Sequence, residues 1–192
     1  MIKNIFSTYL YSQEYNINTT SLKNHIKEIY KTTKTGRSIS NYGGWQSEMF
    51  LKSNHYTKPL FEIINKDIQE IKKIVDVKDN VTLLNYWYNI NKQSSFNRPH
   101  YHLGRTGKEI ISGTFYVTTF KDCGNIMFKR NEFGLDVMYE ERINNYTPYS
   151  SSNYFMIPKN NLCLLFPSNL EHYVEPNLQN KERISISFNY GF

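Results

Sequence analysis

The spacing of apolar residues changes once along the chain, near residue 80. Before that point, apolar residues recur every three or four positions in residues 19–33 and 57–76, which predicts two amphipathic helices. After it, apolar and polar residues alternate in runs typical of β-strands. These runs are residues 81–91, 109–120, 125–129, 152–158, 161–167 and 182–192. The sequence therefore predicts helices first and strands afterwards.

This order of elements predicts an α+β, mainly β domain in which two N-terminal helices buttress a sheet. Several short strands separated by turn residues favour a sandwich or jelly roll. A chain of 192 residues fits one domain over residues 1–192, with a helical part at about 1–80 and a β core at about 81–192. Residues 133–152 are the least periodic, and we expect them to form a loop over a site.

Composition and charge narrow the classes of function. The net charge of +6 is mild for this length and contains no run of like charges, so it does not indicate a nucleic-acid partner. Cys123 and Cys163 lack the spacing of a metal motif, and we expect both to be reduced thiols. The N-terminus has no signal-peptide pattern, and no window approaches the roughly 20 apolar residues of a membrane span. We therefore expect a cytoplasmic protein, and the pattern indicates no particular oligomeric state.

The first candidate for chemistry is a pair of histidines, His100 and His102, in the stretch "PHYH". Side chains two residues apart lie on the same side of an extended chain, so the two imidazoles can share a ligand. A third histidine, His172, follows the apolar run 162–166 and a short turn, at a strand end where ligand sites of β-barrels lie. Histidine is a common metal ligand, and the three form a candidate metal site.

The last strand-like run adds a candidate anion site. Its alternation places Ile184 and Ile186 on one face and Arg183, Ser185 and Ser187 on the other. A guanidinium with a serine hydroxyl two residues further on can grip a carboxylate bidentately. The alternative role for Arg183 is structural, in an ion pair with a carboxylate such as Glu171 or Glu175.

Taken together, these motifs resemble the Fe(II)- and 2-oxoglutarate-dependent oxygenases, in particular a small prolyl-hydroxylase-like group common in phages and bacteria. The resemblance covers most of the chain and depends on the order and spacing of its pieces, with His172 70 residues after His102 and Arg183 11 residues after His172. It implies a double-stranded β-helix fold. The matching stretches are "SNYGGWQS" near residue 40, "NYWYNI" at 85–90, "PHYH" at 99–102, "SGTFYV" at 112–117, "LLFPSNLEHYVEPN" at 164–177 and "ERISISFN" at 182–189.

The resemblance also implies ligands for both cofactors. His100, His102 and His172 would bind Fe(II), and Arg183 with Ser185 would bind the distal carboxylate of 2-oxoglutarate. Three protein ligands on one face of a metal leave positions for the 2-oxo acid and dioxygen. The activity implied is that of an oxygenase, expected to be a hydroxylase, which converts 2-oxoglutarate and O2 to succinate and CO2 while it oxidises a small-molecule or peptidyl substrate.

Four further residues are candidates for cofactor or substrate contacts. Tyr116 shares a strand face with other polar residues and is a candidate for a hydrogen bond to 2-oxoglutarate. Asn85, on the run that begins at residue 81, is a candidate for a polar contact with the cofactor. Trp45 and Gln46, in the glycine-containing stretch near residue 40, are candidates for the substrate rim.

The chain departs from the family at one position, because most members have an acidic residue where His102 stands. A neutral imidazole leaves one more positive charge on the metal than a carboxylate does. A second alignment makes His102 the first ligand and puts Gly104 at the acid position, as in the halogenase variant in which a halide fills the vacancy.

Two other classes of function remain open at this point. One is a cupin-like metal enzyme that keeps three histidines and uses no 2-oxo acid, and the other is a metal-free jelly-roll binding protein. The candidate carboxylate site formed by Arg183 and Ser185 distinguishes the oxygenase from both alternatives, since neither of them needs such a site.

Overall fold

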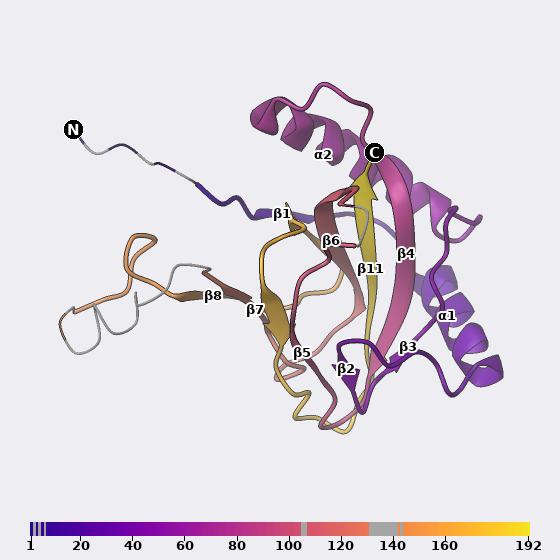
Figure 1. Ribbon diagram of the computed structural model, residues 1–192. Helices are drawn as coiled ribbons and strands as arrows, with labels where there is room; N and C mark the ends of the chain where they lie inside the picture. The colour runs from indigo at the N-terminus through magenta and orange to yellow at the C-terminus, as the bar shows by residue number, and fades with distance from the viewer. Residues whose placement is uncertain (2, 4, 6, 105–106, 131–141, 143) are drawn as a thin grey trace.

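A computed structural model describes the chain except for residues 2, 4, 6, 105–106, 131–141 and 143. Within the described residues, two antiparallel sheets lie face to face, and both helices lie on the side of the larger sheet away from β5 and β7 (Figure 1). The expected mainly β class with two N-terminal helices is confirmed. Most of the first half of the expected loop at 133–152 lies outside the described residues.

The larger sheet has six strands in the order β1-β9-β6-β11-β4-β3, and the smaller has five in the order β2-β5-β10-β7-β8. The strands of the larger sheet are β1 (Tyr11–Glu14), β3 (Trp45–Gln46), β4 (Thr82–Asn91), β6 (Glu109–Thr118), β9 (Leu162–Pro167) and β11 (Arg183–Gly191). Those of the smaller sheet are β2 (Asn41–Tyr42), β5 (Phe96–His100), β7 (Ile126–Lys129), β8 (Asn153–Met156) and β10 (His172–Val174).

The two helices, α1 (Thr20–Thr32) and α2 (Lys58–Val75), bury one apolar stripe each. In α2, Leu60, Ile64, Ile68 and Ile71 recur at helical spacing and are almost fully buried. The stripes pack on the outer face of the six-stranded sheet and form the main hydrophobic core there. No helix in the described part of the chain is both long and apolar enough to cross a bilayer.

Strand β11 separates the core from the space between the sheets. It lies between β4 and β6, and its side chains alternate between the two faces of the sheet. Ile184, Ile186 and Phe188 point to the outer core and have no exposed surface. Arg183 and Ser185 face the five-stranded sheet, so the alternation predicted from the sequence places polar groups in the interior between the sheets.

A second, smaller apolar cluster fills part of the space between the sheets. Tyr116, Leu164 and Phe166 contribute to it from the larger sheet, and Ile126 and Phe128 from β7 of the smaller sheet. This cluster holds the two layers together and leaves the rest of the interlayer space to polar residues.

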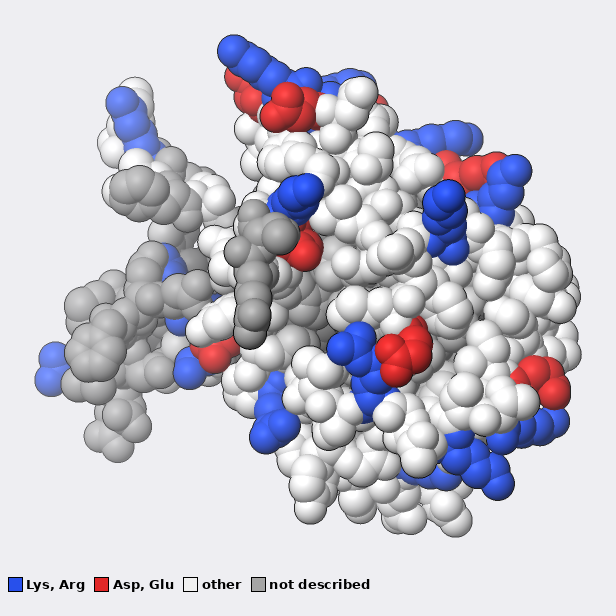
Figure 2. Space-filling model, turned by 45° about the vertical axis from the view of Figure 1, so that its right-hand side comes forward, with Lys and Arg blue, Asp and Glu red and all other residues white. Residues whose placement is uncertain are grey.

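Charged side chains lie in small groups on the surface. Figure 2 shows one face on which Lys and Arg lie singly or beside Asp and Glu, around large uncharged areas. Ion pairs on the helices, Lys31 with Glu28 and Lys73 with Glu70, have N–O distances of 2.7 Å. This distribution agrees with the mild net charge of the sequence.

Candidate active site

A cavity opens between the two sheets, where the polar face of β11 meets β5 and β10. Three histidines and one arginine line it, together with polar side chains from β4 and β6. Apolar groups close part of its wall. The residues that line it include Ser40, Asn89, Asn97, His100, His102, Tyr116, Phe166, His172, Val174, Arg183 and Ser185.

Strand pairing in the smaller sheet brings the three histidines together. His172 at the start of β10 lies opposite His100 at the end of β5. His102 follows two residues later, where its main-chain N–H donates to the carbonyl of Ser168 at 3.0 Å. Each imidazole offers one nitrogen to a cluster in which these atoms all lie within 4.8 Å of one another. The sequence predicted this grouping, although it did not predict the short strands that create it.

Each of the three rings has its Nδ1 atom engaged by an oxygen. The acceptor is the carbonyl of Arg98 for His100, at 2.7 Å, and the carbonyl of Leu170 for His172, at 2.9 Å. For His102 it is the side-chain oxygen of Asn189, at 2.8 Å. None of these oxygens can donate, so the proton of each neutral ring lies on Nδ1. Nε2 of each ring is therefore the nitrogen with a lone pair free for a metal.

Burial keeps the three imidazoles neutral. It lowers the pKa of His102 to about 4, with a further decrease from the neighbouring charge of His100 and a smaller opposing effect of the bond to Asn189. Burial likewise lowers the pKa of His100 and, more strongly, that of His172. Because a histidine must be neutral to ligate, the site is ready to bind a metal at neutral pH without releasing protons.

Arg183 is buried in the same cavity, with 2% of its surface exposed. Its Nη1 atom donates to the carbonyls of Gly124 and Cys123, at 2.9 and 3.2 Å, whereas its Nε atom has no hydrogen-bond partner among the described residues. Burial lowers the pKa of the guanidinium, against a weaker upward effect of Tyr116. A buried charge without a counter-ion is destabilising, and an anion in the cavity would relieve that cost.

The alternative ion pair of Arg183 is absent from the described residues. Lys129 pairs with Glu171 at 3.9 Å, and the carboxylate of Glu175 accepts the main-chain N–H of Asn125 at 3.4 Å. Neither carboxylate forms an ion pair with the guanidinium. Within the described chain, the cationic group is thus left for a ligand.

Of the other two cofactor candidates, the structure brings one to the cavity. Tyr116 on β6 lines the cavity and is paired with Ser185 on the neighbouring strand β11. Asn85 lies beyond the lining, and its Oδ1 atom accepts a hydrogen bond from Asn189 at 2.9 Å. Asn85 is thus not among the residues that line the cavity, and its contact with the cofactor stays a prediction.

The structure does not bring Trp45 or Gln46 to the cavity. Pairing of β3 with β4 sets Trp45 opposite Ile90, on the outer face of the sheet. Its indole is packed in the main core and donates to the carbonyl of Thr33 at 2.6 Å. Gln46 is also buried, and it is not among the lining residues. The register thus turns Trp45 away from the cavity and sets Gln46 opposite Asn89, and a role for these two residues in a substrate rim stays a prediction.

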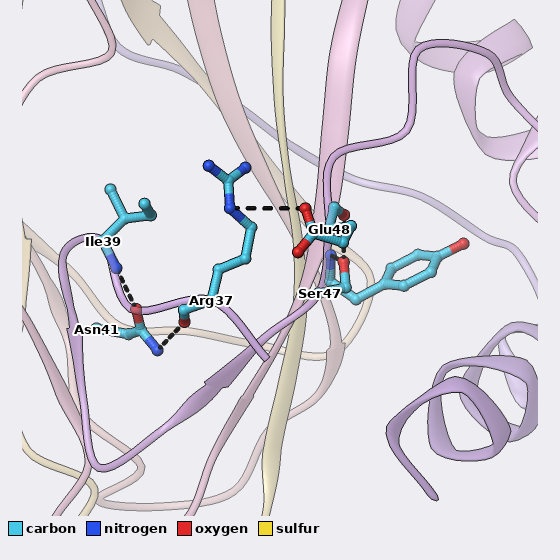
Figure 3. A network of polar contacts seen from close by, with 6 residues as sticks. Arg37, Ile39, Asn41, Ser47 and Glu48 are labelled. Carbon is cyan, nitrogen blue, oxygen red and sulfur yellow. Dashed lines mark hydrogen bonds and ion pairs between the residues drawn. The ribbon is translucent and has the colours of Figure 1, made fainter. Parts of the chain in front are cut away.

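The same stretch contributes a different residue, Ser40, which the sequence did not single out. Figure 3 shows the segment around it, in which Asn41 donates to the carbonyl of Arg37 at 3.0 Å and Arg37 pairs with Glu48 at 3.7 Å. The bond of Asn41 to the main chain of Arg37 ties this segment together, and the hydroxyl of Ser40 at the cavity wall accepts a bond from Asn97 at 3.2 Å. Ser40 belongs to the same stretch "SNYGGWQS" and is a residue of it that does line the cavity.

A family model whose description reads "Putative 2OG-Fe(II) oxygenase" matches residues 85–189. The match covers more than half of the chain and includes the three histidines and Arg183. This chain belongs to the 2OG-Fe(II) oxygenase family. The resemblance drawn from the sequence is confirmed, and with it the oxygenase activity and the cofactors Fe(II) and 2-oxoglutarate. No curated protein sequence matches the chain.

Solved structures share the fold of this oxygenase at low sequence identity. A Pseudomonas putida prolyl-4-hydroxylase has a TM-score of 0.68 at 11% identity, over 95% of this chain and 91% of its own. A Trichoplax adhaerens prolyl hydroxylase, solved with a peptide fragment of the hypoxia inducible factor oxygen degradation domain, has 0.67 at 13%, over 95% and 83%. The viral collagen prolyl hydroxylase of Paramecium Bursaria Chlorella virus-1, solved with 2OG, has 0.58 at 12%, over 96% and 97%. The expected jelly roll is confirmed.

Family membership does not favour the two alternative classes, the cupin-like enzyme without a 2-oxo acid and the binding protein without a metal. The geometry also bears on the halogenase-like alignment. Gly104 is exposed, its N–H donates to Glu109 at 3.2 Å, and it does not line the cavity. His100, which that alignment leaves without a role, lies instead beside His172, with ring centroids 4.4 Å apart.

The lowered pKa of His102 predicts how the metal-free oxygenase loses stability in acid. In the unfolded chain His102 takes up a proton below its ordinary pKa of 6.5, whereas in the folded chain it does so only near pH 4. Each pH unit in that window should remove about 1.4 kcal/mol of unfolding free energy through this one residue. Urea denaturation at several pH values measures the slope. His102→Gln, which cannot titrate, should show a shallower one, and equal slopes in the two proteins would contradict the burial of a neutral His102.

Proposed function

We propose that His100, His102 and His172 hold Fe(II) through their Nε2 atoms and that Arg183 with Ser185 binds the distal carboxylate of 2-oxoglutarate. The observation that carries this proposal is the buried guanidinium, which pairs with no carboxylate of the described residues, in the same cavity as three neutral imidazoles. A dicarboxylate that chelates a metal at one end and meets a cation at the other fits both features at once.

The donor set fits iron. Imidazole nitrogen is a ligand that suits iron, and a triad on one face of the metal leaves positions for other ligands. Three neutral ligands leave the full charge of Fe(II) in place, so a dianionic 2-oxo acid gains more by chelation here than beside a carboxylate ligand. When bound, the metal and 2-oxoglutarate supply the activation of dioxygen and the oxidative decarboxylation that yields succinate.

The chain's own residues bind, orient and exclude water. The fork of Arg183 fixes the far carboxylate, and the hydroxyl of Ser185 lies two residues along the same strand face. Burial raises the pKa of Tyr116, which keeps its hydroxyl protonated as a donor beside Arg183. Phe166 and Val174 contribute apolar surface to the wall, which strengthens the electrostatic contacts inside.

The chemistry of the lining also favours one class of substrate. Among the described lining residues Arg183 is the one charged side chain, and the proposed co-substrate occupies it. The remaining polar groups, such as Asn89 and Asn97, are neutral donors and acceptors. A free amino acid would bring an ammonium group without a carboxylate to meet it, whereas an amino acid within a peptide brings neutral amides. We therefore propose hydroxylation of a peptidyl substrate, and the peptide complex of the Trichoplax adhaerens relative supports this proposal.

Succinate formation with matched substrates tests the substrate proposal. Short peptides that contain a given residue should stimulate turnover of 2-oxoglutarate more than the same residue as a free amino acid, because only the peptide avoids an unpaired ammonium. Proline and proline-containing peptides are the first pair to compare. Higher turnover with the free amino acid would contradict the proposal.

Replacement of Arg183 tests the co-substrate site. Arg183→Ala should leave Fe(II) binding nearly unchanged and weaken 2-oxoglutarate by about 2 to 5 kcal/mol, or roughly 30-fold to several thousand-fold in affinity, because one partner of a buried charged contact is lost. Arg183→Lys should restore part of the loss, since a point charge does not reproduce the fork. Calorimetric titration of 2-oxoglutarate into the anaerobic Fe(II) protein measures both.

A matched control is Arg37→Ala, which removes a guanidinium that is paired with Glu48 outside the cavity. It should bind 2-oxoglutarate as the wild type does. Equal affinity in the wild type and in folded Arg183→Ala would place the distal carboxylate elsewhere.

A further inference from the structure

The three imidazoles differ in what orients them. His100 and His172 donate to main-chain carbonyls, those of Arg98 and Leu170, which no substitution at those positions removes. His102 donates to a side chain, the amide oxygen of Asn189, 87 residues further along the chain. The ring that stands where most of the family has an acid is therefore the one whose orientation depends on a particular amino acid.

Asn189 is itself held in a buried network. It is 5% exposed, its Nδ2 atom donates to Asn85 at 2.9 Å, and its Oδ1 atom accepts from the hydroxyl of Ser112 at 2.8 Å. Because the proton of Ser112 is used in that bond, the contact of 2.8 Å between the hydroxyls of Ser112 and Ser168 is donated by Ser168. In this arrangement the amide oxygen of Asn189 points toward His102.

The same network also contacts the main chain of His102. The carbonyl of Ser168 accepts the main-chain N–H of His102 at 3.0 Å, and the hydroxyl of the same serine supports Asn189 through Ser112. Main chain and ring of the third histidine are therefore positioned by one connected set of hydrogen bonds.

We propose that Asn189 is the positioning residue that makes His102 a metal ligand, an inference that rests on the ligand set proposed above. A carboxylate offers a metal two equivalent oxygens, whereas a neutral imidazole offers one nitrogen in one ring orientation. An acceptor that cannot donate forces the ring proton onto Nδ1 and frees Nε2. Without it, the buried Nδ1–H lacks a partner, and the ring turns or changes tautomer to satisfy it.

Two measurements, metal affinity and thermal stability, distinguish a positioning role of Asn189 from a purely structural role in the sheet. Co(II) serves as an optical probe, with the visible absorption band as a measure of ligand geometry and the melting temperature as a measure of stability. Asn189→Leu, similar in size but without an acceptor, should bind Co(II) roughly 10- to 100-fold more weakly, with an altered band. Asn189→Asp should retain most of the affinity, because its carboxylate accepts the same bond and the amide of Asn85 can turn to donate.

The adjacent residue provides a matched control. Tyr190 lies next to Asn189 on β11 but faces the outer core, where its hydroxyl donates to Asn65 at 2.7 Å. Tyr190→Phe should therefore lower the melting temperature and leave the affinity and absorption band of Co(II) unchanged. Loss of Co(II) affinity in this control as large as in Asn189→Leu would show that loss of any buried bond on the strand is sufficient, and would overturn the proposal.

A double-mutant cycle with His102→Ala tests the ligand set and the role of Asn189 separately. If Asn189 acts through His102, Asn189→Leu weakens Co(II) in the wild-type background and has no further effect in His102→Ala. If His102→Ala itself binds Co(II) as the wild type does, the proposed ligand set fails. If His102→Ala binds weakly while Asn189→Leu binds normally, the ligand set stands and the role of Asn189 is overturned.

Discussion

The alternation of side chains along β11 is the constraint on which both the fold and the site depend. Because this strand lies inside the six-stranded sheet, residues such as Ile186 reach the helices on one face while Arg183 and Asn189 reach the interlayer space on the other. A slip of one residue in its register would exchange the two sets. The same apolar burial that stabilises the sheet therefore holds the guanidinium and the partner of His102 in place.

The polar groups in the interior between the sheets serve the site but lower the stability of the fold. This interior contains a buried cation with an unsatisfied Nε atom and three imidazoles that burial keeps neutral. Burial of such groups is destabilising, and the large outer core offsets that effect. A metal and a dicarboxylate bind the folded form alone, so both cofactors should stabilise the protein by mass action as well as enable its chemistry. Stability and occupancy of the site are linked through the same atoms.

The sequence predicted the elements that carry their own periodicity. Both helices and six strands appear within a few residues of their expected ends, and the polar face of β11 is oriented as the alternation indicated. The strands β5 and β10 were not expected, since they are only 5 and 3 residues long and form through pairing of His100 with His172, which are distant in sequence. Strand register explains why Trp45 entered the core, and only tertiary contact reveals that Asn189 meets His102.

The central claim is that one cavity joins a three-histidine metal site to a carboxylate clamp. The most direct measurement is an anaerobic optical titration, in which Fe(II) and then 2-oxoglutarate are added to the metal-free protein. A visible charge-transfer band that appears only when both are present, and saturates at one equivalent of each, is the predicted result, because the 2-oxo acid must chelate iron held by the three imidazoles. Iron that binds tightly but gives no band on addition of 2-oxoglutarate would contradict the account.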